Sequence, residues 1–433
     1  MIEFGFTRDV EEVAPIYEVS SFEWNGPLEP QQYIDLEVNR FKLYQQYGFE
    51  PIAFYLKDTE ADLYVALGIV VHLKGWYKEP GSLVGAENVT FLLLANIFTR
   101  KQYRNQGLAD KLIRQIFKFV ELEKLNNYKI KYPNKSDQEI INTVSKKFIW
   151  YFYSGVGEYY SRFGCKSQNV DFYKIPFQVL SNELSQNEIQ DLISGQFPNK
   201  SIRLLKSDSE DDQNLIKHIL QNKELQMISQ ITFNSQPIEE NLVNPDIPKC
   251  AIKHDYNFLK IMNIFEQDYF KLTNQPEIAQ ASKIQGAILT NRSQNKSYYC
   301  LWATLISGIT FIVGMGELQI EQTQIRKTSF TSLSDLEGYN LQDVELLLKT
   351  ATYMILKRYN SPQDGAIYVT STELPCEIPR ELLNEYLLNF GFDQKIETVD
   401  SNSLKALPTI RKFASDTSDF DLDWTSIGMY SWN

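Results

Sequence analysis

The chain has 433 residues, of which 43% are hydrophobic and 13% aromatic, so it can bury a large core and is neither disordered nor fibrous. It carries 55 acidic against 43 basic side chains, a formal charge of −12, which argues against broad electrostatic binding to nucleic acid or to an anionic membrane. The four cysteines lie far apart and the three histidines are isolated, so their spacing predicts neither a disulfide framework nor a metal or haem site.

The start of the chain shows no basic stretch followed by an apolar block, so we expect no secretory signal and a cytoplasmic or nuclear location. One uncharged stretch, Ser297–Gly316, has the length of a membrane-spanning helix. It is rich in Tyr, Ile, Val and Thr and is interrupted by Ser307 and Gly308. We therefore interpret it as two buried strands joined at a turn, and we expect no membrane segment.

The first part of the chain predicts a mixed α/β unit, because apolar runs alternate with amphipathic ones. A polar insertion, Lys124–Lys147, interrupts this pattern. The predicted strands are Ile2–Thr7, Pro51–Leu56, Leu63–Leu73, Val89–Phe98, Phe148–Tyr153 and Val170–Phe177. The predicted helices are Val10–Ser21, Pro30–Gln46, an amphipathic helix that begins at Leu108, Gln138–Ser145 and Val156–Phe163.

Residues 180–250 are polar and contain the acidic run Asp208–Asp212, which we interpret as a solvated loop near a domain boundary. We predict a first domain at 1–180, a connection at 181–250 and a second domain at 251–433. In the second domain, a helix, a strand and a further helix repeat the order found in the first: Leu341–Tyr359, Ala366–Thr370 and Pro379–Asn389. This repetition suggests a diverged internal duplication.

The most informative segment is Asn96–Ile113, where a buried strand runs into a glycine turn that opens an amphipathic helix. Such a turn presents unpaired backbone N–H groups and the positive end of the helix dipole, and so forms a site for an anion. Gly107 lets the backbone approach a phosphate, Ala109 keeps the first turn close to it, and Arg104 adds charge. No G-x-x-x-x-G-K-[ST] or complete G-x-G-x-x-G pattern occurs, which disfavours a kinase or a dehydrogenase.

Two motifs together resemble the GCN5-related N-acetyltransferase superfamily: Tyr103–Ala109 after an apolar strand and Tyr160–Gly164 after the next strand. The resemblance implies an α/β (α+β) fold with a central mixed, mostly antiparallel sheet flanked by helices, followed by a second, degenerate domain of the same kind. It implies acetyl-coenzyme A as cosubstrate and no metal. The implied contacts to the pyrophosphate and pantetheine come from Arg104, Asn105, Gln106, Gly107, Leu108 and Ala109 at the turn and from Ile97 and Thr99 on the strand.

A narrower resemblance, to the fungal lysine N-acetyltransferase family, is carried by Tyr153–Gly164, by Phe22–Asn25 and by the length of the second domain. It implies acetyl transfer to the amine of a small cationic molecule, with lysine as the first expectation. Two alternatives remain open: a protein or peptide lysine acetyltransferase, and a non-catalytic scaffold that binds acyl-coenzyme A. The sequence does not decide the oligomeric state.

Catalysis requires a proton for the departing thiolate, and the resemblance assigns this role to Tyr160. The competing interpretation is that Tyr160 is part of the core stripe of a short helix. An oxyanion donor is expected from a backbone N–H of the Ile97–Thr99 edge. The position where some members of the superfamily carry a basic glutamate falls near Phe91, and an asparagine often found after the next strand is replaced by Tyr153 or Ser154.

A general base is therefore not identified, and four substitutes are possible: Glu23, His72, Glu87 and Glu158. In the second domain, the turn Ser334–Asn340 offers two carboxylates and a single glycine where a pyrophosphate would need donors. We therefore expect no coenzyme A there. The closing segment Asp421–Trp432 is aromatic, and we expect it to pack against the protein, at the cleft between the domains.

Overall fold

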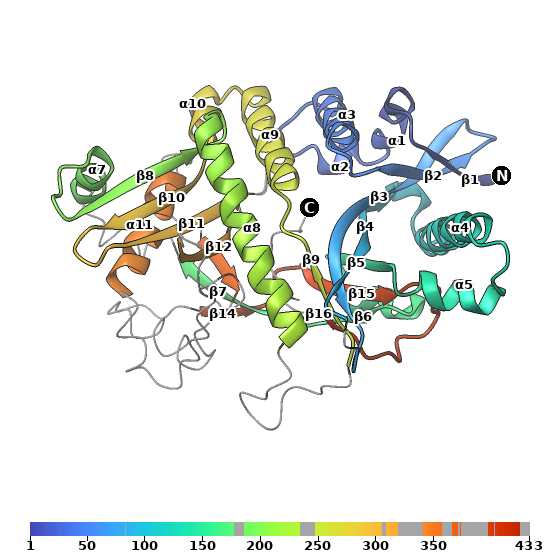
Figure 1. Ribbon diagram of the computed structural model, residues 1–433. Helices are drawn as coiled ribbons and strands as arrows, with labels where there is room; N and C mark the ends of the chain where they lie inside the picture. The colour runs from blue at the N-terminus through green and yellow to red at the C-terminus, as the bar shows by residue number, and fades with distance from the viewer. Residues whose placement is uncertain are drawn as a thin grey trace.

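The computed structural model of the protein describes residues 1–82, 84–176, 186–233, 247–304, 309–318, 341–356, 366–370, 373, 397–401 and 403–424 (Figure 1). Several predicted features lie outside the described residues. They are the turn at Ser307 and Gly308, the turn Ser334–Asn340, the end of the helix after residue 356, the helix Pro379–Asn389 and the closing residues after Trp424.

The first of two sheets carries the N-terminal half of the chain. Its strands follow the order β1-β2-β3-β4-β5-β15-β6, and β9 and β16 extend it beyond β3. Only β4–β5 and β9–β16 pair in parallel; the other neighbours are antiparallel. The strands are β1 (Ile2–Thr7), β2 (Ile52–Asp58), β3 (Leu63–Lys78), β4 (Glu87–Thr99), β5 (Phe148–Ser154), β6 (Lys166–Ser167), β9 (Lys249–Ile252), β15 (Leu407–Lys412) and β16 (Asp423–Trp424).

The second sheet has the order β14-β7-β13-β12-β11-β10-β8. Its β12–β13 pair is parallel and the others are antiparallel. The strands are β14 (Glu397–Asp400), β7 (Asp171–Pro176), β13 (Ala366–Thr370), β12 (Thr310–Glu317), β11 (Lys296–Thr304), β10 (Ile284–Asn291) and β8 (Lys200–Lys206). The predicted fold class, a mixed and mostly antiparallel sheet flanked by helices, is confirmed. The two strands predicted within Ser297–Gly316 are β11 and β12.

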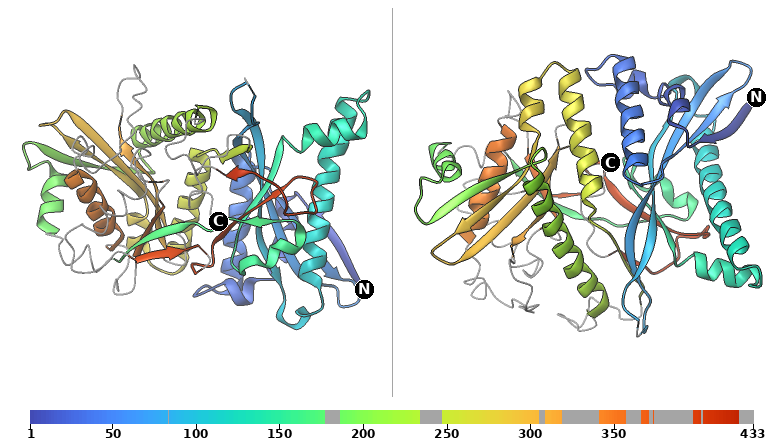
Figure 2. Two further views of the ribbon diagram at one scale, coloured as in Figure 1. Left: turned by 90° about the horizontal axis from the view of Figure 1, so that it is seen from below. Right: turned by 45° about the horizontal axis from the view of Figure 1, so that its top comes forward.

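Helices cover the sheets on both faces, and α3 and α4 lie on opposite sides of the first sheet (Figure 2). In the first half they are η1 (Val10–Glu12), α1 (Ala14–Tyr17), α2 (Ser21–Trp24), α3 (Pro30–Gln46), η2 (Lys101–Tyr103), α4 (Leu108–Lys131), α5 (Asp137–Val144) and η3 (Gly157–Phe163). In the second half they are α7 (Gln186–Ser194), α8 (Glu210–Phe233), α9 (Tyr256–Leu272), α10 (Pro276–Ala281) and α11 (Leu341–Leu356). Each of these helices is too short or too polar to cross a bilayer, as far as the described residues extend.

Two helix boundaries differ from the prediction. The run Val10–Ser21 is broken into η1 and α1, because Pro15 lacks an N–H and is accommodated only in the first turn of a new helix. Helix α4 continues to Lys131, into the insertion predicted as polar, because Glu, Lys and Leu are good helix formers whatever their polarity.

The two sheets exchange strands. Strand β7 lies in the second sheet between β14 and β13, although it comes from the first part of the chain. In return, β15 pairs with β5 and β6 of the first sheet. Strand β8, from the predicted connection, pairs with β10. The sheets therefore do not follow the predicted limits 1–180, 181–250 and 251–433, which remain a prediction about folding units.

The order of elements repeats between the sheets. In the first, β1 is followed by helices, by the antiparallel set β2–β3–β4, by α4, and by β5 parallel to β4. In the second, β8 is followed by helices, by β10–β11–β12, by α11, and by β13 parallel to β12. This is the arrangement that the proposed duplication would leave.

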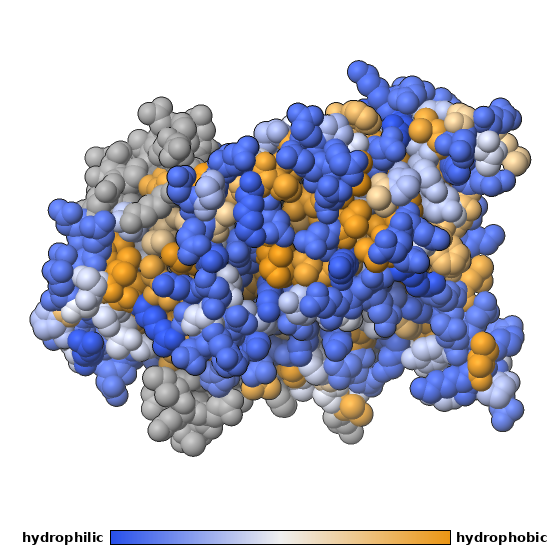
Figure 3. Space-filling model, turned by 90° about the horizontal axis from the view of Figure 1, so that it is seen from above, coloured by the Kyte–Doolittle hydropathy of each residue, from blue (hydrophilic) through white to orange (hydrophobic). Residues whose placement is uncertain are grey.

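The halves meet at α3 and α9, which lie side by side (Figures 1 and 2). The ring of Phe258 on α9 lies 6.2 Å from that of Tyr44 on α3 and 5.8 Å from that of Phe49. Seen from above, apolar side chains gather in the middle of the molecule among hydrophilic ones (Figure 3). The largest apolar cluster includes residues of both halves, so the junction is a packed interface.

Candidate functional site

The parallel strands β4 and β5 stop pairing before they end. Their register runs from Thr90 opposite Phe148 to Leu93 opposite Tyr151. From Leu94 to Thr99, β4 has no partner on its β5 side among the described residues. Main-chain N–H and C=O groups need hydrogen-bond partners, and no neighbouring strand provides them here. The groups on that side of β4 are therefore available to a ligand.

A β-bulge lies in the same part of β4. Its register with β3 shifts between Leu67 and Ile69, and Asn96 has a φ of +53°. The side chain of Ile97 points toward α4 through the space left by Gly68: a Cβ on Gly68 would lie 2.6 Å from Ile97 Cδ1. The side chain of Ile97 thus packs toward α4, and its main chain lies in the bulge, outside the regular pairing with β3.

The turn after β4 opens helix α4 as predicted. Gly107 is the N-cap residue, with a φ of +72°, and no side chain caps the helix. The first intrahelical bond runs from the N–H of Lys111 to the carbonyl of Gly107, at 2.9 Å. The N–H groups of the first turn, from Leu108 to Asp110, are therefore available to an anion. A Cβ on Gly107 would meet nothing within 4 Å, so the space in front of the turn is open.

Arg104 lies against the end of β4. Its guanidinium pairs with Glu23 at 2.7 Å, donates to the carbonyl of Thr99 at 3.0 Å and lies 5.1 Å from the ring of Phe98. The side chain is 40% exposed, so it sits at the rim of the turn. Of the two predicted strand contacts, the carbonyl of Thr99 is thus already engaged by Arg104, and Ile97 lies in the bulge of β4.

Tyr160 lies on η3, which follows β5. Its ring is 9% exposed and packs 4.4 Å from the ring of Phe152, one residue beyond the last β4–β5 pair. Burial raises the pKa of Tyr160, so its hydroxyl stays protonated in the physiological range. Within the described residues, no hydrogen-bond partner is assigned to this hydroxyl. Packing and a proton-donor role are compatible here, since the ring is fixed while the hydroxyl keeps its proton.

Helix η3 adjoins the first turns of α4. The guanidinium of Arg114 on α4 lies 4.9 Å from the ring of Phe163 on η3. Burial raises the pKa of Tyr159 on η3, and the charges of Asp110 and Arg114 on α4 also act on that pKa. The structure thus brings the glycine turn, the open edge of β4 and Tyr160 onto neighbouring elements.

The candidate bases fall into two groups. Glu23 on α2 lies beside the end of β4, because it pairs with Arg104 and the neighbouring Trp24 packs 4.8 Å from Phe98. Glu158 lies on η3, the helix that carries Tyr160. His72 and Glu87 lie elsewhere. His72 pairs with Glu50 at 2.9 Å. Burial lowers the pKa of His72, and the charge of nearby Lys124 lowers it further. Lys124 lies about 24 Å along α4 from the N-terminus of that helix, at ~1.5 Å per residue, so His72 is far from the glycine turn.

Glu87 pairs with Lys147 at the opposite end of β4. Phe91, the residue at the position of the expected glutamate, is fully buried and packs 5.6 Å from the ring of Tyr151. Ser154 accepts from the N–H of Val156 and donates to the carbonyl of Gly157, so its hydroxyl shapes the turn before η3.

The aromatic closing segment packs where it can be described. The ring of Trp424 lies 5.7 Å from that of Tyr151 and 6.1 Å from that of Tyr153, on the strand that borders the opening. The expectation that this segment packs against the protein is confirmed for Trp424. The residues after it lie outside the described part of the chain.

Sequence reasoning missed a buried ion pair near the bulge. Glu37 and Arg40 on α3 are 3% and 9% exposed and contact each other. Burial raises the pKa of the Glu37 carboxyl, and the neighbouring Arg40 acts against this rise. The only sequence signal was a Glu and an Arg three residues apart on a helix, a spacing that is equally common on exposed faces.

The second sheet opens in the same way but is filled by the protein. The parallel pair β12–β13 ends at Phe311 opposite Tyr368. Beyond it, the Nζ of Lys223 on α8 donates to the carbonyl of Val313 at 2.9 Å and pairs with the carboxylate of Glu373. The N–H of Met315 donates to the carbonyl of Glu373 at 2.9 Å. Main-chain groups on this edge are thus satisfied internally.

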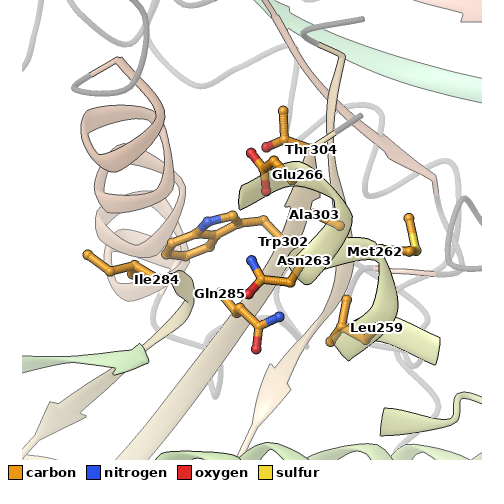
Figure 4. Close-up of a pocket in the computed structure, with 9 residues that line it drawn as sticks. All are labelled: Leu259, Met262, Asn263, Glu266, Ile284, Gln285, Trp302, Ala303 and Thr304. Carbon is orange, nitrogen blue, oxygen red and sulfur yellow. The ribbon is translucent and has the colours of Figure 1, made fainter. Parts of the chain in front are cut away.

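A small polar cavity of about 10 Å³ lies in the second half, where α9 crosses β10 and β11 (Figure 4). It holds space for about one water molecule. The side chain of Gln285 and the indole N–H of Trp302 are buried there, and neither has a hydrogen-bond partner among the residues that the structure describes. The described residues contain no group of three His, Cys, Asp or Glu side chains placed to hold a metal ion.

No protein-family model matches the chain, and no curated protein matches it. Solved structures that are similar include a GCN5-related N-acetyltransferase from Kribbella flavida, at 8% identity and a TM-score of 0.43, covering 95% of this chain and 72% of that one. A probable N-acyltransferase from Enterococcus faecalis V583 has 10% identity and a TM-score of 0.46, covering 95% and 73%. N-myristoyltransferase of Saccharomyces cerevisiae with bound myristoyl-CoA has 11% identity and a TM-score of 0.38, covering 96% and 83%. At these values they assign no family to the chain.

We expect Gly107→Glu to reduce acetyl-coenzyme A affinity by at least ~100-fold, because it places a carboxylate in front of the N–H groups of α4. The measurement is calorimetric titration of the folded variant. Gly195→Glu is a matched control, since Gly195 also has a positive φ, +75°, and open space around it, but lies on the other half. If Gly107→Glu binds acetyl-coenzyme A as tightly as Gly195→Glu and the parent do, the turn is not the binding site.

We expect Tyr160→Phe to lower turnover roughly 10²-fold while acetyl-coenzyme A affinity stays within about threefold, because only the proton donor is lost. Steady-state kinetics together with binding measurements separate the two effects. Tyr159→Phe, on the neighbouring residue, controls for the loss of a hydroxyl. A turnover within about twofold of the parent would leave Tyr160 with a packing role alone.

We expect one acetyl-coenzyme A per chain, because Lys223 and Glu373 occupy the edge of the second sheet that corresponds to the open edge of β4. Calorimetry on the intact chain gives the stoichiometry. In Gly107→Glu the remaining stoichiometry should be zero. A value near two, or a site that survives this substitution, would show that the second sheet also binds the cosubstrate.

Proposed function

We propose that the protein is an acetyl-coenzyme A-dependent N-acetyltransferase that acts on the amine of a small cationic molecule, with lysine as the first candidate. The observation that carries this proposal is the opening of the β4–β5 pair after Leu93 and Tyr151, next to the uncapped N-terminus of α4. An open strand edge offers hydrogen bonds to an amide-bearing arm, and the helix terminus offers them to a phosphate group.

The residues present fit such a cosubstrate, which would supply an activated thioester when bound. The N–H groups of Leu108, Ala109 and Asp110 would hold its pyrophosphate, with Asn105, Gln106 and Gly107 around them and Arg104 at the rim. The bulged edge from Asn96 to Thr99 would orient the arm and donate to the carbonyl oxygen as negative charge develops on it.

Tyr160 would give its proton to the departing sulfur. Its ring is fixed against Phe152 at the end of β5, which holds the hydroxyl in one place. A proton donor that is already oriented lowers the activation free energy, because no conformational entropy is lost in placing it during the reaction.

The charge around the opening favours a cationic acceptor. Glu158 lies on η3 with Tyr160, Glu23 lies at the end of β4 where Arg104 balances its charge, and the chain as a whole carries a formal charge of −12. The amine must lose a proton before it attacks, because a lysine side chain has a pKa of ~10.4 in water. Either carboxylate could receive this proton, directly or through water.

The test is an amine panel of free lysine, spermidine and a lysine-containing peptide, each incubated with acetyl-coenzyme A and analysed for acetylated product by mass spectrometry. We expect kcat/KM for free lysine to exceed that for the peptide by at least ~10-fold. Gly107→Glu and Tyr160→Phe serve as low-activity controls. A preference for the peptide would indicate a protein acetyltransferase, and tight coenzyme A binding without any product would indicate a scaffold.

A further inference from the structure

A buried arginine from the late part of the chain lies behind the candidate site. Arg411 is on β15, opposite Trp150 of β5 in the antiparallel register, and it is 2% exposed. A guanidinium is always charged, so its burial costs free energy unless its N–H groups find partners. The partners of Arg411 lie on η3, on α4 and in the loop that follows β15.

The first partner is the last residue of the helix that carries Tyr160. The Nε of Arg411 donates to the main-chain carbonyl of Phe163 on η3 at 2.8 Å. Carbonyl groups at the end of a helix have no acceptor role within the helix, so a donor from outside is needed to satisfy them. The ring of Phe163 lies 6.2 Å from that of Tyr160. Arg411 therefore anchors η3 three residues after Tyr160.

The second partner is on α4. The guanidinium of Arg411 pairs with Glu121 and lies 4.3 Å from the ring of Phe117. Glu121 also accepts from the indole N–H of Trp150 at 3.0 Å and from the main-chain N–H of Ala414 at 3.1 Å. One carboxylate on α4 thus connects this helix to β5, to β15 and to the loop after β15.

The loop after β15 also packs against the end of η3. Gly164 follows η3 with a φ of +74°, and a Cβ on it would lie only 2.7 Å from the main-chain carbonyl carbon of Asp416. The loop therefore approaches so closely that residue 164 has no room for a side chain. The end of η3 is thus held both by the hydrogen bond from Arg411 and by direct packing.

The shape of a guanidinium gives this network its rigidity. Its N–H donors form a planar fork, so a carbonyl bound by one nitrogen and a carboxylate bound by another keep a fixed separation and angle. Arg411 holds the carbonyl of Phe163 and the carboxylate of Glu121 in this way. Helices η3 and α4 thereby keep one relative position, and with them Tyr160 and the glycine turn at the start of α4.

We propose that Arg411 is a positioning residue, which binds Phe163 and Glu121 and so fixes the Tyr160 hydroxyl relative to the cosubstrate at the start of α4. It touches no reacting atom. The catalytic part of this inference rests on the proposed function, whereas the placement of η3 does not. The proton donor of the first half thus takes its position from a residue 248 positions beyond Phe163 in the chain.

The test variant is Arg411→Lys. It keeps the positive charge beside Glu121, but an ammonium on a flexible stem replaces the planar fork, so the two partners are no longer held at a fixed separation. Arg203→Lys is the matched control. Arg203 also donates through two nitrogens to one carboxylate, that of Asp212, and also joins a strand to a helix, but it does so in the second half.

The first readout is hydrogen exchange of residues 157–164 in the full chain without any ligand. We expect exchange there to rise at least ~10-fold in Arg411→Lys and to stay within about threefold of the parent in Arg203→Lys. If Arg411→Lys does not fold, Glu121→Gln is measured in its place. It leaves an oxygen for the N–H groups of Trp150 and Ala414 and removes the charge that pairs with Arg411, so it should show the same rise.

The second readout is turnover per folded molecule with the amine that the parent acetylates. We expect kcat to fall at least ~10-fold in Arg411→Lys while acetyl-coenzyme A affinity stays within about threefold, and both to stay within about twofold in Arg203→Lys. In a Tyr160→Phe background, Arg411→Lys should lower kcat less than about twofold further, because the group that it positions is already missing. A general loss of stability would lower kcat equally in both backgrounds.

Unchanged exchange in residues 157–164 would overturn the inference. A full loss of kcat on top of Tyr160→Phe would also overturn it, since Arg411 would then act by another route. A parent that acetylates no amine, but whose exchange rises as expected in Arg411→Lys, would refute the proposed function and leave the anchoring of η3 by Arg411 standing.

Discussion

The proposed binding site depends on two parallel strands that part before they end. Buried main-chain N–H and C=O groups are nearly always paired, so a strand edge in the interior needs a partner. After Leu93 the edge of β4 receives none from β5, and the bulge at Asn96 turns it further from a regular ladder. Helix α4 begins directly after that edge, so one short segment provides two sets of unused donors. Next to this edge, the ring of Tyr160 on η3 packs against Phe152 of β5.

In the second sheet, the corresponding strand edge is occupied by the protein's own side chains. Its strands follow the same order, and its parallel pair also ends early. There the ammonium of Lys223 on α8 donates to the carbonyl of Val313 on β12 and forms an ion pair with Glu373. A buried ammonium needs both a carboxylate and a carbonyl acceptor to be tolerated, and both are present. The corresponding edge of the second sheet is thus occupied by side chains of the protein itself, and α8 also joins the halves through Glu224 and Trp76.

Local signals in the sequence predicted the elements of the site well. Proline and capping residues fix the start of α3, and Gly107 with the apolar stripe after it fixes the start of α4. What the sequence could not reveal depends on contacts between distant residues. Arg104 pairs with Glu23, which lies 81 positions earlier. Glu37 and Arg40 have the spacing of any surface pair, and only the fold places them inside. Strand exchange is hidden for the same reason, since β7 and β15 look like ordinary strands.

That exchange constrains how the chain acquires its structure during synthesis. Strand β5 receives its neighbour β15 only when residues 407–412 have been made. At ~5–20 residues per second the ribosome needs roughly 10–50 s to travel from one to the other. Until then one edge of the first sheet is bare, and a bare edge invites pairing with other chains. The first sheet is therefore completed by a strand that is made long after β5, and the edge of β5 is exposed to wrong pairing for the whole of that interval.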